Sequence, residues 1–282
     1  MGGRIAVVTD STSYLPDGYA ERFGVRVVPL YVVLDGVAGA EGVEVTPADV
    51  AGALNRHQSV TTSRLTPAQL RAAYRQAFDA GATGIVSVHL SRELSGTWDS
   101  ARRAAEEVAP EAIRVVDSGS AAMGLGFSVL DAAQAARDGA DLGEVAETAA
   151  RTAARTSTVF YVDTLEHLRR GGRIGAAQAW LGTALAVKPI LHVRDGRIVP
   201  LEKVRTASRG LARLEALAVR LAGDGPVDVA VQHLAAPQRA AALADRLRDR
   251  LPRLGRLLGS EIGAVVGAHV GPGVVGVVVV RR

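Results

Sequence analysis

The sequence predicts an α/β protein of two domains, an N-terminal parallel α/β/α sheet and a C-terminal α/β domain with a mixed sheet. Apolar, strand-like runs alternate with helical stretches through the first half of the chain, and this alternation is typical of a parallel sheet covered by helices. Asp195-Gly196 between two apolar runs of the second half indicates an antiparallel hairpin. The chain has 282 residues, which is enough for two ordinary domains.

The first half is expected to begin with strands over 4–9 and 25–34. Thr46-Pro47 and Thr66-Pro67 each predict the start of a helix, because Thr is a good N-cap and Pro suits the first helical position. The remaining elements expected here are a helix over 68–80, a strand over 84–89, a helix over 96–108, a strand over 113–117 and a long Ala-rich helix.

The pattern changes near residue 155. The expected elements are a strand over 158–162, a short helix over 165–170 ended by Gly171-Gly172, strands over 188–193 and 197–204, two further helices and a final Val-rich strand. No Pro/Ser-rich linker marks the border. We therefore expect an N-terminal α/β domain over 1–155 and a C-terminal α/β domain over 156–282, packed closely.

Composition excludes several classes of protein. The chain has no cysteine, which excludes disulfides, iron–sulfur clusters and thiol catalysis. No apolar run reaches the roughly 18 residues of a membrane span, and the N-terminus lacks a signal-peptide layout. Only 4% of the residues are aromatic, too few for a nucleic-acid surface despite a net charge of +4. We expect a cytoplasmic protein that binds no nucleic acid and has no stable membrane anchor.

Five short segments rich in hydroxyls and glycines lie in the loops of the expected strand–loop–helix units. In parallel α/β sheets, ligands bind beyond the carboxyl ends of the strands. Hydroxyls and the free N–H groups at a helix start suit a small anion, and the segments contain no metal-ligand spacing. The segments are Thr9–Thr12, Thr61–Ser63, Leu94–Thr97, Asp117–Ser120 and Ala268–Gly273.

Taken in order, these segments resemble the DegV family of bacterial fatty-acid-binding proteins. The resemblance covers nearly the whole chain. One departure is Arg64, which stands where the family usually has Gln after Thr-Ser, and its long charged side chain could reshape the head-group entrance. The most specific stretches are Leu168-Arg169-Arg170-Gly171-Gly172-Arg173-Ile174, Lys188-Pro189-Ile190-Leu191, Pro200–Arg205 and Gly267–Gly273.

The resemblance implies that a long-chain fatty acid lies between the two domains, with its carboxylate held by hydroxyls and its tail in an apolar tunnel. Gly96 precedes a helix, whose positive dipole end favours an anion. A protonated His269 would pair with the carboxylate. The family's head-group residues fall on Thr62, Ser63, Ser95 and His269, and Gly96 and Ser118 complete the expected ligand-binding set.

The resemblance also implies a partner, a separate ATP-dependent fatty acid kinase that converts the carboxylate to an acyl phosphate. The basic residues expected to meet this partner are Arg170, Arg173 and Arg205. The chain itself lacks a Gly-x4-Gly-Lys-Ser/Thr phosphate loop and a plausible Mg²⁺ carboxylate cluster. We therefore expect a lipid carrier of an acyl-phosphate pathway, with no catalytic residue, no metal and no cofactor of its own.

Two alternatives stay open at this point. A hydrolase or phosphotransferase would use Ser95 or Thr62 as nucleophile and His269 as base, with Asp10 or Asp117 as the orienting acid. The neighbouring hydroxyls favour a capping role for these two carboxylates instead. The second alternative is a carrier of another amphiphilic lipid. No role is assigned to the remaining histidines, which are His57, His89, His167, His192 and His233.

Overall fold

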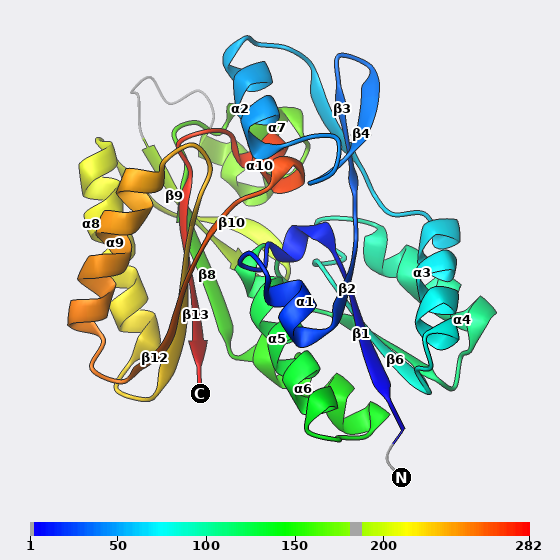
Figure 1. Ribbon diagram of the computed structural model, residues 1–282. Helices are drawn as coiled ribbons and strands as arrows, with labels where there is room; N and C mark the ends of the chain where they lie inside the picture. The colour runs from blue at the N-terminus through cyan, green and yellow to red at the C-terminus, as the bar shows by residue number, and fades with distance from the viewer. Residues whose placement is uncertain (1–2, 181–187) are drawn as a thin grey trace. The chain divides into compact units, whose positions relative to one another are not determined.

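The computed structural model describes residues 3–180 and 188–282. Within these residues the chain forms two compact units (Figure 1). The first unit contains the described residues up to Tyr31 and Ser63–Ala154, and the second contains Val32–Thr62 and the described residues from Arg155 onward. The continuous domains expected over 1–155 and 156–282 differ from this grouping at 32–62, a segment that packs with the second unit.

The first unit is built on a four-stranded parallel sheet, which confirms the prediction. Its strand order is β2-β1-β6-β7, and all three pairings are parallel. In register, Thr9 lies opposite Val88 and His89 opposite Asp117. The strands are β1 (Ile5–Asp10), β2 (Val25–Val28), β6 (Gly84–His89) and β7 (Ile113–Asp117).

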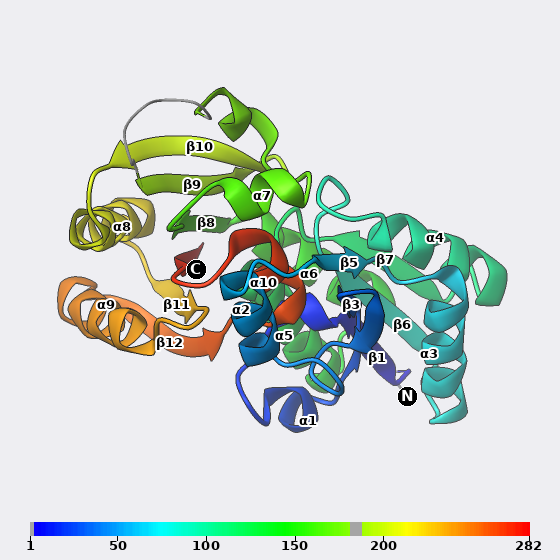
Figure 2. The ribbon, with the colours of Figure 1, turned by 90° about the horizontal axis from the view of Figure 1, so that it is seen from above.

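Helices cover both faces of this sheet (Figure 2). α3 (Pro67–Asp79) and α4 (Thr97–Val108) pack together on one face. α5 (Met123–Arg137) and α6 (Leu142–Ala154) pack on the other, with α1 (Tyr19–Phe23) beside α5. The predicted start at Thr66 is confirmed, because its hydroxyl accepts from the Gln69 backbone N–H in a capping box. A short 3₁₀ turn, η1 (Ser11–Ser13), follows β1.

The single strand expected over 25–34 is wrong. β2 ends at Val28, and a separate strand, β3 (Tyr31–Leu34), enters a three-stranded sheet of order β4-β3-β5. Pro29 separates the two strands and has no N–H for a ladder. The next N–H, that of Leu30, donates to the Ser11 hydroxyl at 3.0 Å instead of to a strand.

The other two strands of the small sheet are β4 (Val37–Ala40) and β5 (Val60–Ser63), neither of which was predicted. Asp35 and Gly36 join β3 to β4 with φ angles of 48° and 89°. Two successive residues in the left-handed region suit the tight turn of a β-hairpin. β5 matters most for the site, because it carries Thr62.

The second unit contains a six-stranded mixed sheet, as predicted. Its order is β10-β9-β8-β13-β11-β12, with β11–β12 parallel and the other pairings antiparallel. The predicted hairpin at Asp195-Gly196 is confirmed. The prediction missed β11 and β12. The strands are β8 (Thr156–Tyr161), β9 (Lys188–Arg194), β10 (Arg197–Val204), β11 (Val227–His233), β12 (Leu254–Glu261) and β13 (Val275–Arg281).

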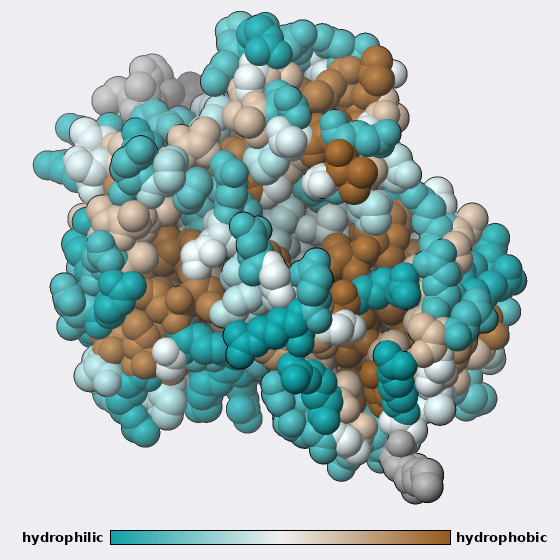
Figure 3. Space-filling model, in the orientation of Figure 1, coloured by the Kyte–Doolittle hydropathy of each residue, from teal (hydrophilic) through white to brown (hydrophobic). Residues whose placement is uncertain are grey.

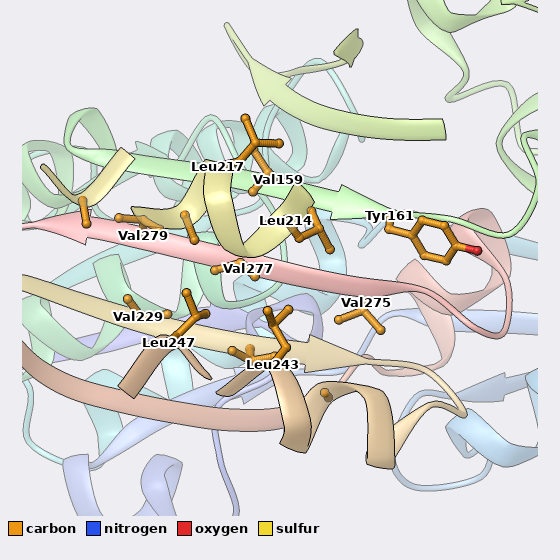
Figure 4. Packing of buried hydrophobic residues seen from close by; sticks show 14 of the residues in the cluster. Val159, Tyr161, Leu214, Leu217, Val229, Leu243, Leu247, Val275, Val277 and Val279 are labelled. Atoms are coloured by element: carbon orange, nitrogen blue, oxygen red, sulfur yellow. The ribbon is translucent and has the colours of Figure 1, made fainter. Parts of the chain in front are cut away.

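Two long helices bury one face of this sheet. α8 (Ala207–Ala222) and α9 (Pro237–Arg250) place Leu214, Leu217 and Leu243 against the valines of β13 (Figure 4). This cluster holds the core of the second unit. Hydrophilic side chains lie on the outward surfaces of these helices and of α3 and α4 (Figure 3), the pattern of amphipathic helices on a sheet. Within the described ranges, no helix has both the length and the apolar character that crossing a membrane requires.

A further group of short elements completes the second unit. α10 (Ala264–Val270) contacts both α2 (Pro47–Asn55) and α7 (Glu166–Arg170), and η2 (Gly175–Trp180) contacts β10. The predicted start at Thr46 is confirmed by a capping box with Asp49. The contact between α2 and α10 explains why residues 32–62 belong to this unit.

Candidate functional site

The strand order of the first unit reverses between β1 and β6, which makes this place a topological switch point. β2, the next strand after β1, lies on one side of β1, and the later strands β6 and β7 lie on the other. Ligands of open parallel sheets bind beyond such a point. Here Asp10 and His89 end the two strands, and both are fully buried. Asp10 Oδ2 accepts from His89 Nδ1 at 2.9 Å and from the Leu90 N–H at 3.0 Å. Asp10 Oδ1 accepts from the Thr12 N–H and hydroxyl at 3.1 and 2.5 Å.

The chain of hydrogen bonds continues inward from His89. Its Nε2 lies 2.8 Å from the Ser87 hydroxyl, which also accepts from the Tyr74 hydroxyl at 2.9 Å. Burial raises the pKa of Tyr74, so this hydroxyl stays a donor. The order Asp-His-Ser is that of a catalytic triad. However, the exposed fraction of Asp10, Ser87 and His89 is 0%, so no substrate reaches Ser87.

These contacts confirm the capping role predicted for Asp10 and give His89 a structural one. Residues 87 and 89 are two positions apart along β6, so their side chains point to the same face of the sheet. That spacing is the signal by which the pair could have been found in the sequence.

The Ser95–Thr97 segment lies at the start of α4. Ser95 Oγ is 3.0 Å from the Thr97 hydroxyl and accepts from the Thr97 N–H at 3.3 Å. The Thr97 hydroxyl also accepts from the Leu65 N–H at 3.3 Å. Through these two contacts, Thr97 ties the backbone at Leu65, two residues after Ser63, to the loop that carries Ser95.

Arg64 packs directly on Gly96. A Cβ atom on Gly96 would lie 2.6 Å from Arg64 Nη1 and 2.9 Å from its Cδ. Gly96 is the N-cap of α4 and makes no side-chain cap. The Arg64 guanidinium therefore adds a positive charge at a helix start whose free N–H groups already favour an anion. This is the position at which the family resemblance leads one to expect Gln.

Ser118 is buried in a turn after β7, and its hydroxyl is used locally. It donates to the Ser120 carbonyl and accepts from the Ser120 N–H, both at 3.2 Å. Asp117 accepts from the Gly119 N–H at 2.8 Å, which confirms its predicted capping role. The Ser120 carbonyl accepts from the Ser91 N–H at 2.7 Å and so ties this turn to the loop that leads to Ser95. Ligand binding by Ser118 stays a prediction.

In the second unit the structure brings together two predicted residues that are 207 positions apart in the sequence. Thr62 on β5 and His269 on α10 form a hydrogen bond of 2.9 Å between Oγ1 and Nε2. Burial, helped by the charge of Arg173, lowers the pKa of His269 to about 4. Near pH 7 this pKa favours the neutral form of His269. Pairing of its protonated form with a carboxylate stays a prediction.

The other ring nitrogen of His269 decides against a triad at this residue. His269 Nδ1 is buried, and within the described part of the chain it has no hydrogen-bond partner. A catalytic histidine needs an acid on that nitrogen. Both candidate acids, Asp10 and Asp117, are hydrogen-bonded to their own loops in the first unit. Among the described residues, His269 therefore lacks the hydrogen-bonded acid that a triad requires on Nδ1.

Glu41 fixes the helix that carries His269. Its buried carboxylate accepts from the Val265 N–H at 2.7 Å, in the first turn of α10. A carboxylate at this place satisfies a backbone donor that the helix leaves free. Glu41 follows β4, so the small sheet that supplies Thr62 also anchors α10.

The predicted partner residues differ in their surroundings. Arg170 is exposed but shares Glu166 with Arg169, through contacts of 2.6 to 2.9 Å. These two guanidinium groups lower the pKa of Glu166 to about 2. Arg205 is exposed. Arg173 is half-buried and donates to the backbone carbonyl of residue 171 at 2.6 Å.

No cluster of three or more His, Cys, Asp or Glu side chains suited to a metal ion occurs among residues 3–180 and 188–282.

The parallel sheet, the mixed sheet and these polar loops define a two-unit α/β protein. The chain belongs to the DegV family, whose model, described as "Uncharacterised protein, DegV family", matches residues 4–282. The DegV domain-containing protein SCO2569 of Streptomyces coelicolor is 57% identical to the chain over 282 residues, which is 100% of each protein.

Two solved structures share the fold. A DegV family protein from Thermus thermophilus, described by its fatty acid binding, superposes with a TM-score of 0.94 at 35% identity, covering 99% of this chain and 100% of that one. DegV from Bacillus subtilis, described as a fatty acid binding protein, superposes with a TM-score of 0.89 at 33% identity, with the same coverage. The family resemblance and the fold class predicted from the sequence are thereby confirmed.

Proposed function

We propose that this protein binds a long-chain fatty acid and holds its carboxylate through Thr62 and His269. The observation that carries the proposal is the hydrogen bond between these two residues. A carboxylate accepts hydrogen bonds only, so it needs donors. If the neutral imidazole donates from Nε2 to the Thr62 oxygen, the Thr62 hydroxyl hydrogen is left to donate to the ligand. The fatty acid binding described for the Thermus and Bacillus proteins supports this choice of ligand.

Ser63, Ser95, Gly96 and Ser118 are the further donors that we assign to the head group. Ser95 and Gly96 suit the role best, because they stand at the start of α4, a helix of 12 residues. The Arg64 side chain packed on Gly96 supplies a cation beside these donors. Ser118 is the weakest member of the set, because its hydroxyl already bonds within its own turn.

The tail supplies most of the proposed affinity. A C16 acid brings roughly 14 methylenes, and each contributes ~0.8 kcal/mol when buried, or about 11 kcal/mol before the cost of ordering the chain. A neutral hydrogen bond contributes only about 1 kcal/mol. The hydroxyls therefore orient the acid, and the alkyl chain determines how tightly it binds.

The test is to extract the purified protein and analyse the extract by mass spectrometry, expecting about one equivalent of a C14–C18 fatty acid. Added palmitate or oleate should raise the melting temperature of delipidated protein, since a ligand that binds only the folded state stabilises it. Recovery of a lysolipid or an isoprenoid acid would favour the other amphiphile. Recovery of polar metabolites alone, with no thermal shift, would refute the proposal.

A matched pair of variants tests the head group. Thr62→Val removes the hydroxyl and keeps the shape of the side chain, and Thr61→Val makes the same change at the neighbouring exposed position of β5. We expect Thr62→Val to weaken palmitate binding about five- to tenfold, which corresponds to the loss of one hydrogen bond of about 1–1.4 kcal/mol. Thr61→Val should bind as the unmodified protein does. Equal behaviour of the two variants would exclude Thr62 from the site.

We further propose that the bound acid is presented to a separate ATP-dependent kinase. In that step a carboxylate oxygen attacks the γ-phosphorus of ATP, the bond from this phosphorus to the ADP oxygen breaks, and acyl phosphate and ADP result. The absence of a phosphate loop from the sequence supports a carrier role. Arg170, Arg173 and Arg205 are the proposed partner contacts, and surface charges such as those of the exposed Arg170 and Arg205 steer association.

Arg205→Glu is the sharpest test of the partner surface. Arg173 is less suitable, because it bonds to the turn beside His269 and its charge acts on that residue. With an ATP-binding subunit from the same cell, Arg205→Glu should slow acyl-phosphate formation and leave palmitate affinity unchanged. The control Arg194→Glu changes a side chain that is 72% exposed, on the β9–β10 hairpin, and should alter neither. Loss of both properties in Arg205→Glu would place Arg205 in the ligand site.

The same assay tests the enzyme alternative. The isolated protein should neither hydrolyse acyl esters nor turn over ATP. If it does, and if Ser95→Ala removes that activity, the carrier proposal fails.

A further inference from the structure

Two histidines of the second unit pack against glycines in a reciprocal arrangement. His269, on α10, lies against Gly171, which ends α7. His167, on α7, lies against Gly271, which ends α10. A Cβ atom on Gly171 would overlap His269 Nδ1 and lie 2.8 Å from its Cε1. A Cβ atom on Gly271 would overlap His167 Cδ2 and lie 2.7 Å from its Nε2. We call these four residues the glycine–histidine interlock.

The two glycines are required for different reasons. Gly271 has a φ angle of 77°, a conformation that side chains disfavour whatever surrounds it. Gly171 has φ −75° and ψ −5°, a helical conformation that any residue adopts. Its backbone therefore places no demand for glycine. A side chain at position 171 would instead collide with the imidazole of His269, and its Cβ atom would also lie 3.2 Å from the His167 carbonyl oxygen.

The interlock decides how His269 carries its proton. Nδ1 faces Gly171, is buried, and has no hydrogen-bond partner among the residues the structure describes. Among those residues, either tautomer leaves Nδ1 without a partner, but orphaned buried N–H groups are rarer in folded proteins than orphaned acceptors. The proton therefore belongs on Nε2, which lies 2.9 Å from the Thr62 hydroxyl oxygen. With the Thr62 oxygen accepting from Nε2, the Thr62 hydroxyl hydrogen points elsewhere.

We propose that Gly171 and His167 are positioning residues, which hold His269 as the neutral Nε2–H tautomer and thereby orient the Thr62 hydroxyl toward an anionic head group. The orientation of the head group rests on the proposed function, whereas the tautomer does not. The ring of His167 fills the space at Gly271 and holds the end of α10. Gly171 lets the ring of His269 approach the end of α7.

The charged surroundings agree with a neutral pair. The positive charge of Arg173 lowers the pKa of His269 further, after burial, and the Arg173 guanidinium donates a hydrogen bond to the carbonyl of Gly171. Arg170 and His57 also lower the pKa of His167, while Glu166 opposes them. Glu41 lies at the other end of α10, on the Val265 N–H. For both histidines burial is the largest effect, and it disfavours the imidazolium.

The test compares Gly171→Ala with Gly225→Ala. Gly225 is exposed, and a Cβ atom there would meet nothing within 4 Å. Nitrogen-15 NMR of histidine-labelled protein reads the tautomer directly. The unmodified protein should show His269 with its proton on Nε2. In Gly171→Ala the His269 ring signals should shift and palmitate binding should weaken about tenfold, while Gly225→Ala should leave both unchanged.

A double-mutant cycle separates positioning from general damage. In a His269→Ala background the methyl group of Gly171→Ala has space, so it should cause no further loss of binding or of melting temperature. If Gly171→Ala alone does not fold, the double variant still should, and His167→Ala supplies an independent perturbation that should also shift the His269 ring signals.

Three results would overturn the inference. These are an Nδ1–H tautomer in the unmodified protein, unchanged His269 signals in Gly171→Ala, and equal losses from Gly171→Ala with and without the His269 ring. If the unmodified protein binds no fatty acid, the proposed function fails, and the tautomer and the melting-temperature cycle still test the interlock.

Discussion

Replacing Asp10 by Asn should destabilise the first unit strongly, although it changes no more than one oxygen to an NH₂ group. The carboxylate accepts four hydrogen bonds, two from Thr12, one from His89 and one from Leu90. An amide offers one acceptor oxygen. If that oxygen keeps the bonds from Thr12, the NH₂ group faces the Leu90 N–H, donor against donor, at a site that is 0% exposed.

The magnitude follows from the burial. Removing one partner of a buried pair costs about 3–5 kcal/mol, because the remaining groups stay in the interior without compensation. The expected loss is therefore a large share of the 5–15 kcal/mol typical of a folded domain. The control is Asp117→Asn, at a carboxylate that is 24% exposed, accepts one backbone bond and lies 3.5 Å from the exposed guanidinium of Arg92. Its expected cost is about 0.5–1.5 kcal/mol.

The chain offers a probe specific to each unit, because one of its two tryptophans, Trp98, lies in the first unit and the other, Trp180, in the second. Urea unfolding followed by Trp98 fluorescence in a Trp180→Phe background reports on the first unit alone. With an m-value of about 2 kcal/mol per M, Asp10→Asn should lower the midpoint by about 1.5–2.5 M and Asp117→Asn by less than about 1 M. Equal shifts would refute the view that the buried Asp10–His89 pair organises the switch point.

Two further predictions concern the ligand site. The pKa of His269 is about 4 in the folded protein against 6.5 for the free side chain, so the unfolded chain takes up the proton first as the pH falls. The stability associated with neutral His269 is therefore fully present above about pH 6.5 and is lost toward pH 4. Between about pH 7.5 and pH 4.5 the melting temperature of His269→Gln should fall less than that of the unmodified protein, and an equal fall would contradict the depressed pKa. Ser95→Ala should weaken palmitate binding by about 1 kcal/mol, or roughly fivefold. Calorimetry measures the affinity, with Ser208→Ala at an exposed position as the control. An unchanged affinity would remove Ser95 from the head-group set.

Local chemistry made much of the fold predictable. The starts at Thr46 and Thr66 were correct because a capping residue and a following proline act within one helical turn. The hairpin at Asp195-Gly196 was correct because its two φ angles are positive, a demand the residues themselves meet. The strand expected over 25–34 failed because its apolar pattern continues through Pro29, while the missing N–H of that residue ends the ladder.

The sequence by itself determined the fold class, the helix starts at Thr46 and Thr66 and the segments that hold the candidate residues, because these depend on contacts between near neighbours in the chain. Only the tertiary structure decided that Thr62 meets His269 across 207 positions, and that Gly171 leaves room for the imidazole. It also decided that Asp10 and His89 are shut away from solvent. The physical reason is that burial and close packing bring distant segments together, and burial is what keeps His269 neutral and makes the Asp10 hydrogen bonds costly to break.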